Sequence, residues 1–490
     1  MSRVVVIGAG LAGLSAACHL RGAGHEVTVL ERESIPGGRA GRLERDGFSF
    51  DTGPTVFTMP ELVDDALQAV GSRLSDRVRL TRLDPAYRAH FADGSIIDVR
   101  AEHEDMRAEI ARACGDDDAA AFDEFVDWLT ALHDVEVPHF IDRNFNSSID
   151  LVTRPAALLR LLRLGAFGRL GHSVGSRFTD DRLRRLFTFQ AMYAGLAPDR
   201  ALALYAVITY MDSVAGVWAP EGGIHAVPAA MAEAATAAGV DLVTDATVTA
   251  VLRRSDGAVA GVELAGGEKI AADAVVCTID PPVAWQTVLT DTAPPRRPGR
   301  AQYSPSAVVW HLGVRGQVGP EVRHHNIHFG QQWGPAFDEL LVGGTLMSDP
   351  SRLVCVPSLH DDTSAPDGHT SLYVLEPVPN LAVGRIDWER EAPVVRDLLG
   401  TFLAEQGYPT EVVTEEFVTP DDWLAQGMAA GTPFALAHTF AQTGPFRPRN
   451  RSRRVPGLVF AGSGTVPGVG VPIVLISGKL AAQRVTEYLR

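Results

Sequence analysis

The fold is decided by the stretch VVVIGAGLAG, residues 4–13. A strand of apolar residues leads directly into the pattern GxGxxG, formed by Gly8, Gly10 and Gly13. The first glycine permits a tight turn, the second lets a ligand approach the backbone, and the third lets helix and strand pack closely. An Ala- and Leu-rich helix and a second strand, HEVTVLE at residues 25–31, are predicted to complete one βαβ unit.

An acidic residue stands at the end of the second predicted strand. Glu31 lies 21 positions after Gly10, where a carboxylate can accept hydrogen bonds from a ribose hydroxyl. The order of strand, glycines, helix and acid favours a dinucleotide-binding site over a turn that only shapes the backbone. Leu11 and Ala12 begin the helix, whose free N–H groups and dipole are expected to hold a pyrophosphate.

A second glycine-rich turn follows the acid. Arg32 precedes the turn PGGR at residues 36–39, which contains Gly38 and Arg39. This turn can bring backbone amides and a guanidinium to the diphosphate and flavin side of a dinucleotide. Simple nicotinamide dehydrogenases do not need it. From these residues alone, FAD and NAD both remain candidates.

Length, charge and cysteine content limit the class of protein. The chain has 490 residues, so two or three structural units are expected. Its formal net charge of −16 disfavours nucleic acid as a partner, because nucleic-acid binders neutralise phosphates with clustered Lys and Arg. No CxxC pair suggests a zinc site or a disulfide framework; the cysteines are Cys18, Cys114, Cys277 and Cys355.

The same features bear on where the protein acts. Met1 leads straight into the first strand without a charged leader, an apolar region and a cleavage site, so secretion is not expected. No run of eighteen or more apolar residues is present, so nothing is predicted to span a bilayer. We therefore expect a cytoplasmic protein, which also suits its cysteine content.

Changes of pattern along the chain predict a nucleotide-binding domain in three pieces, separated by two inserted pieces. The helical stretch AVPAAMAEAATAAG and the alternating residues 241–251 mark the return to the first domain. The predicted nucleotide-binding pieces are residues 1–70, 216–300 and 431–490, the substrate and helical insert covers 71–215, and the second substrate piece covers 301–430.

Separated blocks of the sequence are similar to one enzyme family. FDTGPT occupies residues 50–55, and GVWAPEGGIHAVPAAM occupies 216–231. VPSLHDDTSAPDGHTSLYVLEPVPNL occupies 356–381, and AGSGTVPGVGVPIVLISGK occupies 461–479. With the GxGxxG, acid and GGR signature, these blocks resemble the flavin-containing amine oxidase and phytoene desaturase superfamily. Within it they resemble the bacterial carotenoid (phytoene) desaturase family, over essentially the whole chain.

The resemblance implies a fold and a cofactor. The implied fold is α/β, with a Rossmann-like FAD-binding domain that is discontinuous in sequence. A mixed α+β substrate domain is inserted into it, with a helical segment that is a candidate for membrane association. FAD is the implied cofactor. The implied contacts to the flavin, the adenine and the phosphates are Gly53, Pro54, Thr55, the backbone amide of Val248, Gly462, Gly470 and Val471.

The last of these blocks departs from many related flavoenzymes in one respect. They carry an acid after the glycine of the last strand, whereas here Gly462 is followed by Ser463 and Gly464. The desaturase branch also has small residues at this place, so the departure supports that branch and removes one candidate flavin contact.

The implied activity is desaturation of a phytoene-type polyene in carotenoid biosynthesis, by hydride transfer to flavin N5. No second GxGxxG within a βαβ unit is present, so we expect oxygen or a quinone to re-oxidise the flavin. No catalytic side chain is assigned. Glu221 and His225 could relay a proton, but solvated or structural roles fit them better.

Two groups of side chains have competing interpretations. His324, His325 and His328 lack a convincing fourth ligand, so no metal is predicted and a strand-and-turn histidine cluster is the better interpretation. A set of aromatic residues could line a polyene tunnel or pack in the core; they are Phe187, Phe189, Tyr193 and Trp218.

A basic segment interrupts this acidic chain. Between residues 151 and 185, arginines are offset only by Asp180 and Asp181. PAALLRLLRLGAFGRL, residues 155–170, places leucines and arginines at helical spacing, which suits a helix in the headgroup region of a membrane. The same pattern suits a basic amphipathic helix packed on the core. A peripheral surface on the inner face of the cell membrane is thus a candidate partner beside the apolar polyene.

Other functions remain open on the same fold. A flavin amine oxidase would need an aromatic cage at the flavin to receive a deprotonated amine. Later-step desaturases and ketolases share the carotenoid framework. A non-catalytic prenyl-lipid carrier would use the architecture for lipid handling, which the GGR turn and the C-terminal flavin block argue against.

Overall fold

Strand β1 (Arg3–Ile7) lies at the centre of a parallel sheet. The computed structural model describes residues 1–295 and 301–490, so the last five residues of the predicted piece 216–300 lie outside the described residues. The sheet has five strands in the order β19-β13-β1-β2-β9. Distant parts of the chain contribute them, namely β2 (Glu26–Leu30), β9 (Asp241–Val243), β13 (Ala274–Cys277) and β19 (Leu458–Phe460).

Both faces of this sheet are buried. Val4 and Val6 of β1 point into one apolar cluster, and Val5 and Ile7 point into another. This alternation follows from the two-residue period of a strand, and the covering of both faces explains why β1 is continuously apolar.

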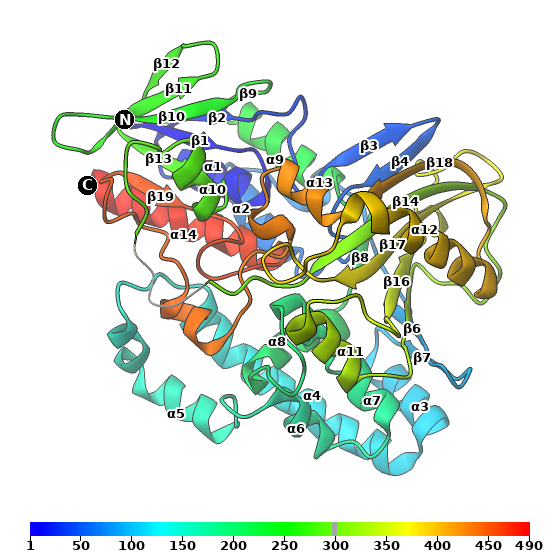
Figure 1. Cartoon of the computed structure of the whole chain (residues 1–490). Helices are drawn as coiled ribbons and strands as arrows, with labels where there is room; N and C mark the ends of the chain where they lie inside the picture. Colours follow the sequence, from blue (N-terminus) through cyan, green and yellow to red (C-terminus); the bar gives the residue numbers. More distant parts are fainter. Residues whose placement is uncertain (296–300) are drawn as a thin grey trace.

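Helices cover the first face. The core there joins α1 (Leu11–Gly22) to α14 (Val471–Leu489), and Figure 1 shows the blue and red helices together. The two helices approach closely, because a Cβ on Gly478 would lie 2.3 Å from the carbonyl oxygen of Ala12. Ser15 Oγ donates to the carbonyl of Leu475 at 2.8 Å. Two further helices pack against α1, namely α2 (Glu61–Gln68) and α9 (Ala226–Ala237).

A small antiparallel sheet covers the second face. Its strands are β10 (Val248–Arg253), β11 (Val259–Leu264) and β12 (Lys269–Ala271), and α10 (Pro281–Thr287) packs in the same cluster. The alternating stretch 241–251 therefore forms strands in two different sheets. The chain turns between them at Asp245, whose φ of 53° interrupts the extended backbone.

The second domain is built on a seven-stranded sheet in the order β18-β14-β17-β16-β15-β6-β7. Only the β15–β6 pair within it is parallel. Helix α12 (Trp388–Glu405) packs one side of it through Val395 and Leu399. The strands are β6 (Tyr87–His90), β7 (Ile96–Val99), β14 (Ser306–Arg315), β15 (His325–His328), β16 (Arg352–Cys355), β17 (His369–Val378) and β18 (Glu411–Val418).

A helical layer lies below this sheet in Figure 1. Its core is a group of phenylalanine rings, in which Phe187 contacts Phe122, Phe125 and Phe178. None of the described helices is both long and apolar enough to cross a membrane. The layer consists of α3 (His103–Cys114), α4 (Asp116–Glu136), α5 (Pro155–Arg163), α6 (Leu170–Gly175), α7 (Asp181–Leu186) and α8 (Ala206–Ser213).

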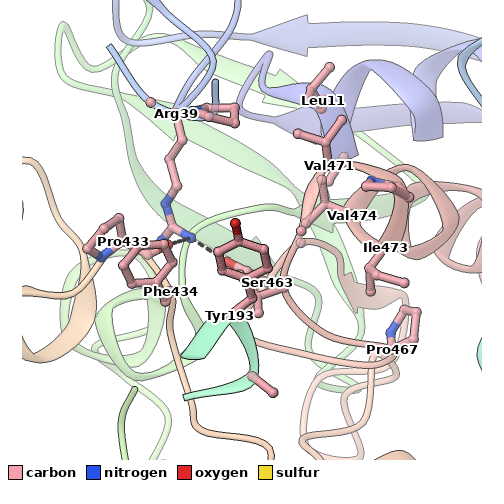
Figure 2. A pocket seen from close by; sticks show the side chains of 18 of the residues that line it. Leu11, Arg39, Tyr193, Pro433, Phe434, Ser463, Pro467, Val471, Ile473 and Val474 are labelled. Atoms are coloured by element: carbon pink, nitrogen blue, oxygen red, sulfur yellow. Dashed lines mark hydrogen bonds between the residues drawn. The ribbon is translucent and has the colours of Figure 1, made fainter. Parts of the chain in front are cut away.

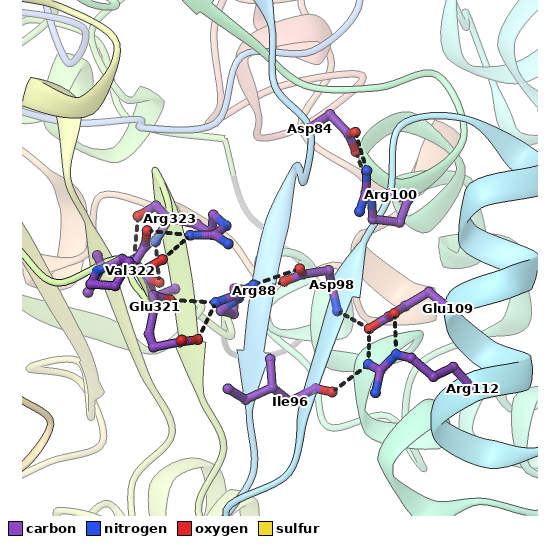
Figure 3. Close-up of polar contacts among 12 residues, drawn as sticks. Asp84, Arg88, Ile96, Asp98, Arg100, Glu109, Arg112, Glu321, Val322 and Arg323 are labelled. Atoms are coloured by element: carbon purple, nitrogen blue, oxygen red, sulfur yellow. Dashed lines mark hydrogen bonds and ion pairs between the residues drawn. The ribbon is translucent and has the colours of Figure 1, made fainter.

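A buried arginine joins distant parts of the second domain (Figure 3). Arg88 on β6 forms a two-pronged pair with Asp98 on β7, with N–O distances of 2.7 and 2.8 Å. Its remaining nitrogen donates to the carbonyl of Glu321 at 2.7 Å and to the carboxylate of the same residue at 3.0 Å. The planar guanidinium thus fixes the segment before β15 against the β6–β7 hairpin.

The two sheets draw on different parts of the chain. Every strand of the five-stranded sheet lies within residues 1–70, 216–300 or 431–490. Every strand of the seven-stranded sheet lies within 71–215 or 301–430. The chain therefore crosses repeatedly between a nucleotide-type domain and a mixed α+β domain with an attached helical layer.

Candidate functional site: a cavity between the two domains

A cavity of about 1780 Å³ lies between the two domains and the helical layer. It exceeds the roughly 300–1,000 Å³ of an ordinary small-molecule pocket, so it can hold a large cofactor together with a long ligand. All of the predicted cofactor-binding residues except Gly13 line it. They are Gly8, Gly10, Leu11, Ala12, Glu31, Arg32, Gly38, Arg39, Gly53, Pro54, Thr55, Val248, Gly462, Gly470 and Val471.

The first glycine turn forms one wall. Helix α1 begins after Gly10 without a side-chain cap, so its first N–H groups are free to meet a ligand in the cavity. Gly8 has a φ of +98°, which suits glycine. Gly13 lies behind the wall, where a Cβ would be 1.9 Å from the Gly8 carbonyl oxygen. Its role is therefore close packing of helix on strand.

The second turn crosses the first. Gly37 N donates to the carbonyl of Ala9 at 3.0 Å, and a Cβ on Gly38 would lie 3.1 Å from Gly10 Cα. Gly38 also has a φ of +57°. The absence of side chains at this crossing keeps backbone amides accessible from the cavity.

Glu31 shapes the turn as well as facing the cavity. Its carboxylate accepts from Ala9 N at 2.6 Å and from Glu33 N at 3.0 Å. Arg32 points away from the glycine turns to the edge of the cavity, where it donates to the carbonyl of Gln426 at 2.7 Å. The acid is therefore held in place before any ribose binds.

Arg39 brings a guanidinium into this region (Figure 2). It donates to Asp280 Oδ2 at 3.0 Å, to the carbonyl of Pro433 at 3.0 Å and to Ser463 Oγ. Asp280 and Ser463 both line the cavity, after strands β13 and β19 respectively. This cluster joins the GGR turn to the carboxyl ends of two parallel strands, where α/β proteins bind their ligands.

A second uncapped helix faces the cavity. Gly470, with a φ of 113°, precedes α14, and no side chain caps the helix there. Gly462 N donates to Ser477 Oγ at 3.0 Å, which fixes the turn after β19 against α14. On the opposite wall, a Cβ on Gly53 would lie 1.9 Å from the Arg39 carbonyl oxygen, so FDTGPT packs directly on the GGR turn.

The rest of the cavity is mostly apolar and extends into the helical layer. Phe189 and Tyr193 line it, as do Tyr373 and Phe434. Figure 2 shows Tyr193 and Phe434 in the same cavity as Arg39 and the start of α14. Phe187 belongs instead to the ring cluster of the core, and Trp218 is outside the lining. The farther lining includes Phe140, Ile141, Leu158, Leu161, Leu162 and Phe167.

The histidines singled out by sequence have local partners. His225 Nε2 lies 2.8 Å from the carbonyl of Pro36, and His225 N donates to Asp51 at 3.0 Å, so this residue supports the GGR turn. Glu221 is exposed. His325 Nε2 lies 3.0 Å from the carbonyl of Thr55, and burial lowers its pKa to about 4. His324 lies beside His360, and His328 beside Tyr408.

Sequence reasoning missed three buried acids in the cavity wall. Asp280 follows strand β13, and its place at the carboxyl end of a parallel strand could have identified it. Glu136 and Asp212 lie on helices α4 and α8 of the insert and also line the cavity. No motif marks either of them, because only the packing of the helices turns their carboxylates inward.

A family model described as flavin containing amine oxidoreductase matches residues 11–486. The chain belongs to this family. Family membership makes FAD the cofactor, and the site fits it: two uncapped helix starts, crossed glycine turns and a preset acid all face one cavity. The expected α/β fold with an inserted substrate domain is thus confirmed, and it is the fold of the flavin amine oxidoreductases.

Curated relatives match over almost the full length. A phytoene dehydrogenase of Streptomyces griseus is 51% identical, over 99% of this chain and 95% of the relative. A zeta-carotene-forming phytoene desaturase of Myxococcus xanthus is 37% identical, over 99% and 94%. A carotenoid 3,4-desaturase of Haloarcula japonica is 34% identical, over 99% and 98%.

Solved structures share the fold at much lower identity. An oxidoreductase from Methanosarcina mazei superposes with a TM-score of 0.61 at 18% identity, covering 99% of this chain and 100% of the other. Cyclohexylamine oxidase from Brevibacterium oxydans superposes with a TM-score of 0.58 at 16% identity, covering 100% and 99%. At this distance the likeness concerns the fold alone.

Proposed function

We propose that this family member is an FAD-dependent desaturase of a phytoene-type polyene in carotenoid biosynthesis. The observation that carries the proposal is the cavity. One part of its wall consists of the crossed glycine turns, Glu31 and the two uncapped helix starts, which we call the cofactor cradle, and beyond this cradle the cavity continues as a long apolar space. The relatives support the same reaction class, because the 51% and 37% identical proteins are named for phytoene. Two amine oxidases that share the fold, putrescine oxidase and cyclohexylamine oxidase, are each only 16% identical.

The chain's own residues divide the work. The uncapped starts of α1 and α14 would hold the phosphates and the flavin edge of FAD, and Glu31 would meet the ribose. Bound FAD supplies the acceptor for the electron pair that leaves the substrate as hydride. The polyene would lie in the apolar part of the cavity, next to the flavin. Tyr193, Phe434 and the other apolar lining would hold it there and exclude water.

The test is an anaerobic incubation of FAD-loaded protein with phytoene in liposomes. We expect the visible flavin band to bleach while new conjugated polyene absorption appears. Putrescine, offered under the same conditions, should leave the flavin oxidised. Bleaching by the amine but not by phytoene would overturn the proposal in favour of an amine oxidase.

Oxygen or a quinone is proposed to re-oxidise the flavin, since the sequence contains no second GxGxxG unit for a nicotinamide. After anaerobic reduction by phytoene, adding a soluble quinone should restore the flavin band. Rapid reduction of the oxidised protein by NADPH would contradict this part of the proposal.

We also propose that the protein takes its substrate from a membrane surface. The cavity reaches the outside at a set of exposed residues that we call the apolar rim. Val152 and Phe440 are each 60% exposed while lining the cavity. The apolar rim consists of Val152, Leu162, Phe167, Phe440 and Phe446.

Basic side chains surround part of this rim. Arg154, Arg160, Arg163 and Arg169 are exposed in and beside α5. Apolar residues that enter the acyl boundary, with arginines at the headgroups, are the pattern of a peripheral membrane helix. An apolar rim at the cavity opening would let a polyene leave the bilayer without crossing water.

Co-sedimentation with anionic vesicles tests the membrane proposal. The double variant R160E/R163E should lose most of its vesicle binding. R254E/R390E is the matched control, because Arg254 and Arg390 are exposed outside this region. Equal binding of both double variants would overturn the proposal.

A further inference from the structure

Asp212 is an acid at the end of α8 that lines the cavity although its residue is only 3% exposed. Its carboxylate contacts hydroxyl and amide groups. Ser213 Oγ donates to Oδ1 at 2.9 Å, Tyr87 OH donates to Oδ2 at 3.4 Å, and Gln190 Nε2 lies 3.4 Å from both oxygens. None of these partners is a cation, so no opposite charge at these contacts neutralises the carboxylate.

A second buried acid in the same cavity has a different environment. Glu136 at the end of α4 is also buried, and its Oε1 has no hydrogen-bond partner. Burial raises the pKa of Glu136 well above its ordinary value, so this side chain stays protonated. Burial also raises the pKa of Asp212, but only to about 7, because hydrogen bonds from Ser213, Gln190 and Tyr87 lower the pKa and oppose the effect of burial.

This difference in pKa gives Glu136 and Asp212 different capacities to accept a proton. A group that is neutral throughout the working range cannot accept a proton, whereas a carboxylate that titrates near neutrality can. Asp212 is therefore the better proton acceptor of the two. It also shares the cavity with Tyr193, one of the aromatic residues beside the cofactor cradle.

We propose that the Asp212 carboxylate accepts the proton that leaves the polyene during desaturation, an inference that rests on the proposed function. One hydrogen leaves the polyene as a hydride. Its electron pair is the pair that bound FAD accepts in the proposed desaturation. The C–H bond on the adjacent carbon then breaks, its proton forms an O–H bond on Asp212, and its electron pair completes the new C=C bond. Charge and atoms balance, and no further reactant is needed.

The surroundings of Asp212 contain other titratable groups, which bear on any pH dependence. Burial, and then the charge of Asp212, raise the pKa values of Tyr87 and Tyr193, so both stay neutral at working pH. Titratable groups on the elements packed around α8 include Tyr87 on β6, His133, Asp134 and Glu136 on α4, Tyr193 in the segment Phe189–Ala194, and Tyr205 in the segment Ala203–Tyr205.

The experiment is anaerobic stopped-flow reduction of the FAD-loaded protein by phytoene in liposomes, from about pH 5 to about pH 9, a range that brackets the expected value of about 7. In the wild type the rate should rise with pH and level off as Asp212 loses its proton. D212N should react about 10²–10⁴-fold more slowly and lose this dependence. Y87F should move the rise to higher pH, because it removes a donor to the carboxylate.

D118N is the matched control. Asp118 is 2% exposed and accepts from Thr179 N at 2.7 Å and Asp180 N at 3.1 Å, so it is a buried acid with a purely local structural role. D118N should lower stability and keep the wild-type pH profile. A second readout is the infrared difference spectrum of the holoenzyme between low and high pH. It should show a protonated carboxyl band that D212N lacks.

The possible failures are distinct. A wild-type flavin that phytoene never bleaches removes the proposed function and this inference with it. Bleaching with a flat pH profile, or a D212N rate within a few-fold of the wild type, overturns the role of Asp212 and leaves the desaturase in place. Loss of folding in D212N would leave the wild-type profile and the Y87F shift to decide.

Discussion

Arg39 and Asp280 form an ion pair, with 3.0 Å between Nη2 and Oδ2, that ties the second glycine turn to the end of strand β13. Asp280 is buried and Arg39 is partly exposed in the cavity. The pair therefore places a guanidinium beside the cofactor cradle and fixes its plane. Ser463 and the Pro433 carbonyl complete the set of Arg39 contacts.

This relationship predicts the effect of R39K. Lysine keeps the charge but cannot contact Asp280, Ser463 and the Pro433 carbonyl with one planar fork. We expect FAD to bind about tenfold more weakly, or about 1.4 kcal/mol. Titration of the apoprotein with FAD, followed by flavin fluorescence, measures the change. R45K is the control, since Arg45 pairs with Glu416 and lies on the exposed β3 (Arg42–Arg45), outside the cavity lining. An unchanged affinity in R39K would contradict the prediction.

The packing of Gly13 predicts a loss of stability. In G13A the new methyl group would lie 1.9 Å from the Gly8 carbonyl oxygen, so α1 must move away from the sheet. We expect the free energy of unfolding to fall by about 3 kcal/mol, as for other overpacked cores. Urea denaturation of the FAD-loaded protein measures it. G266A should be nearly neutral, because no atom lies within 4 Å of a Cβ there.

The raised pKa of Asp212 also affects stability, apart from any role in the reaction. Its pKa is about 7 in the folded protein against the ordinary 3.8, so the wild type loses stability as pH rises from about 4 to about 7. D212N does not titrate. Its stability relative to the wild type should therefore increase over that window, by on the order of 4 kcal/mol, and stay constant above it. Urea denaturation at several pH values tests this, and a constant difference would contradict it.

The apolar rim predicts a specific loss of membrane binding. F440S/F446S should reduce retention on vesicles several-fold, because less apolar surface enters the bilayer. FAD content should be unchanged. V394S/L398S is the control, since Val394 and Leu398 are similarly exposed on α12. If both double variants lose retention equally, general surface polarity rather than the rim explains the effect.

Much of the fold could be predicted because its signals are local. The strand, the glycines and the acid of residues 4–31 act on immediate neighbours, and they form β1, α1 and β2 as expected. The cofactor-binding residues carried over from the family resemblance also line one cavity, and several lie at element boundaries: Val248 begins β10, Gly462 follows β19, and Val471 begins α14.

The acids of the insert could not be predicted because their environment is not local. Asp212 faces the cavity through the packing of α8 against α4 and the contact with Tyr87, which is 125 positions away. In sequence it is an ordinary helical aspartate. The aromatic residues show the same limit, because Phe189 lines the cavity whereas Phe187, two positions earlier, lies in the core.

The contact between α1 and α14 has a consequence for biosynthesis. Ser15 and Leu475 are 460 positions apart, yet they pack directly behind the glycine turn. On the ribosome, α1 emerges early and waits for most of the chain to be translated before its partner helix appears. The cradle is therefore incomplete in the nascent chain, and flavin loading becomes a late event that follows translation of α14.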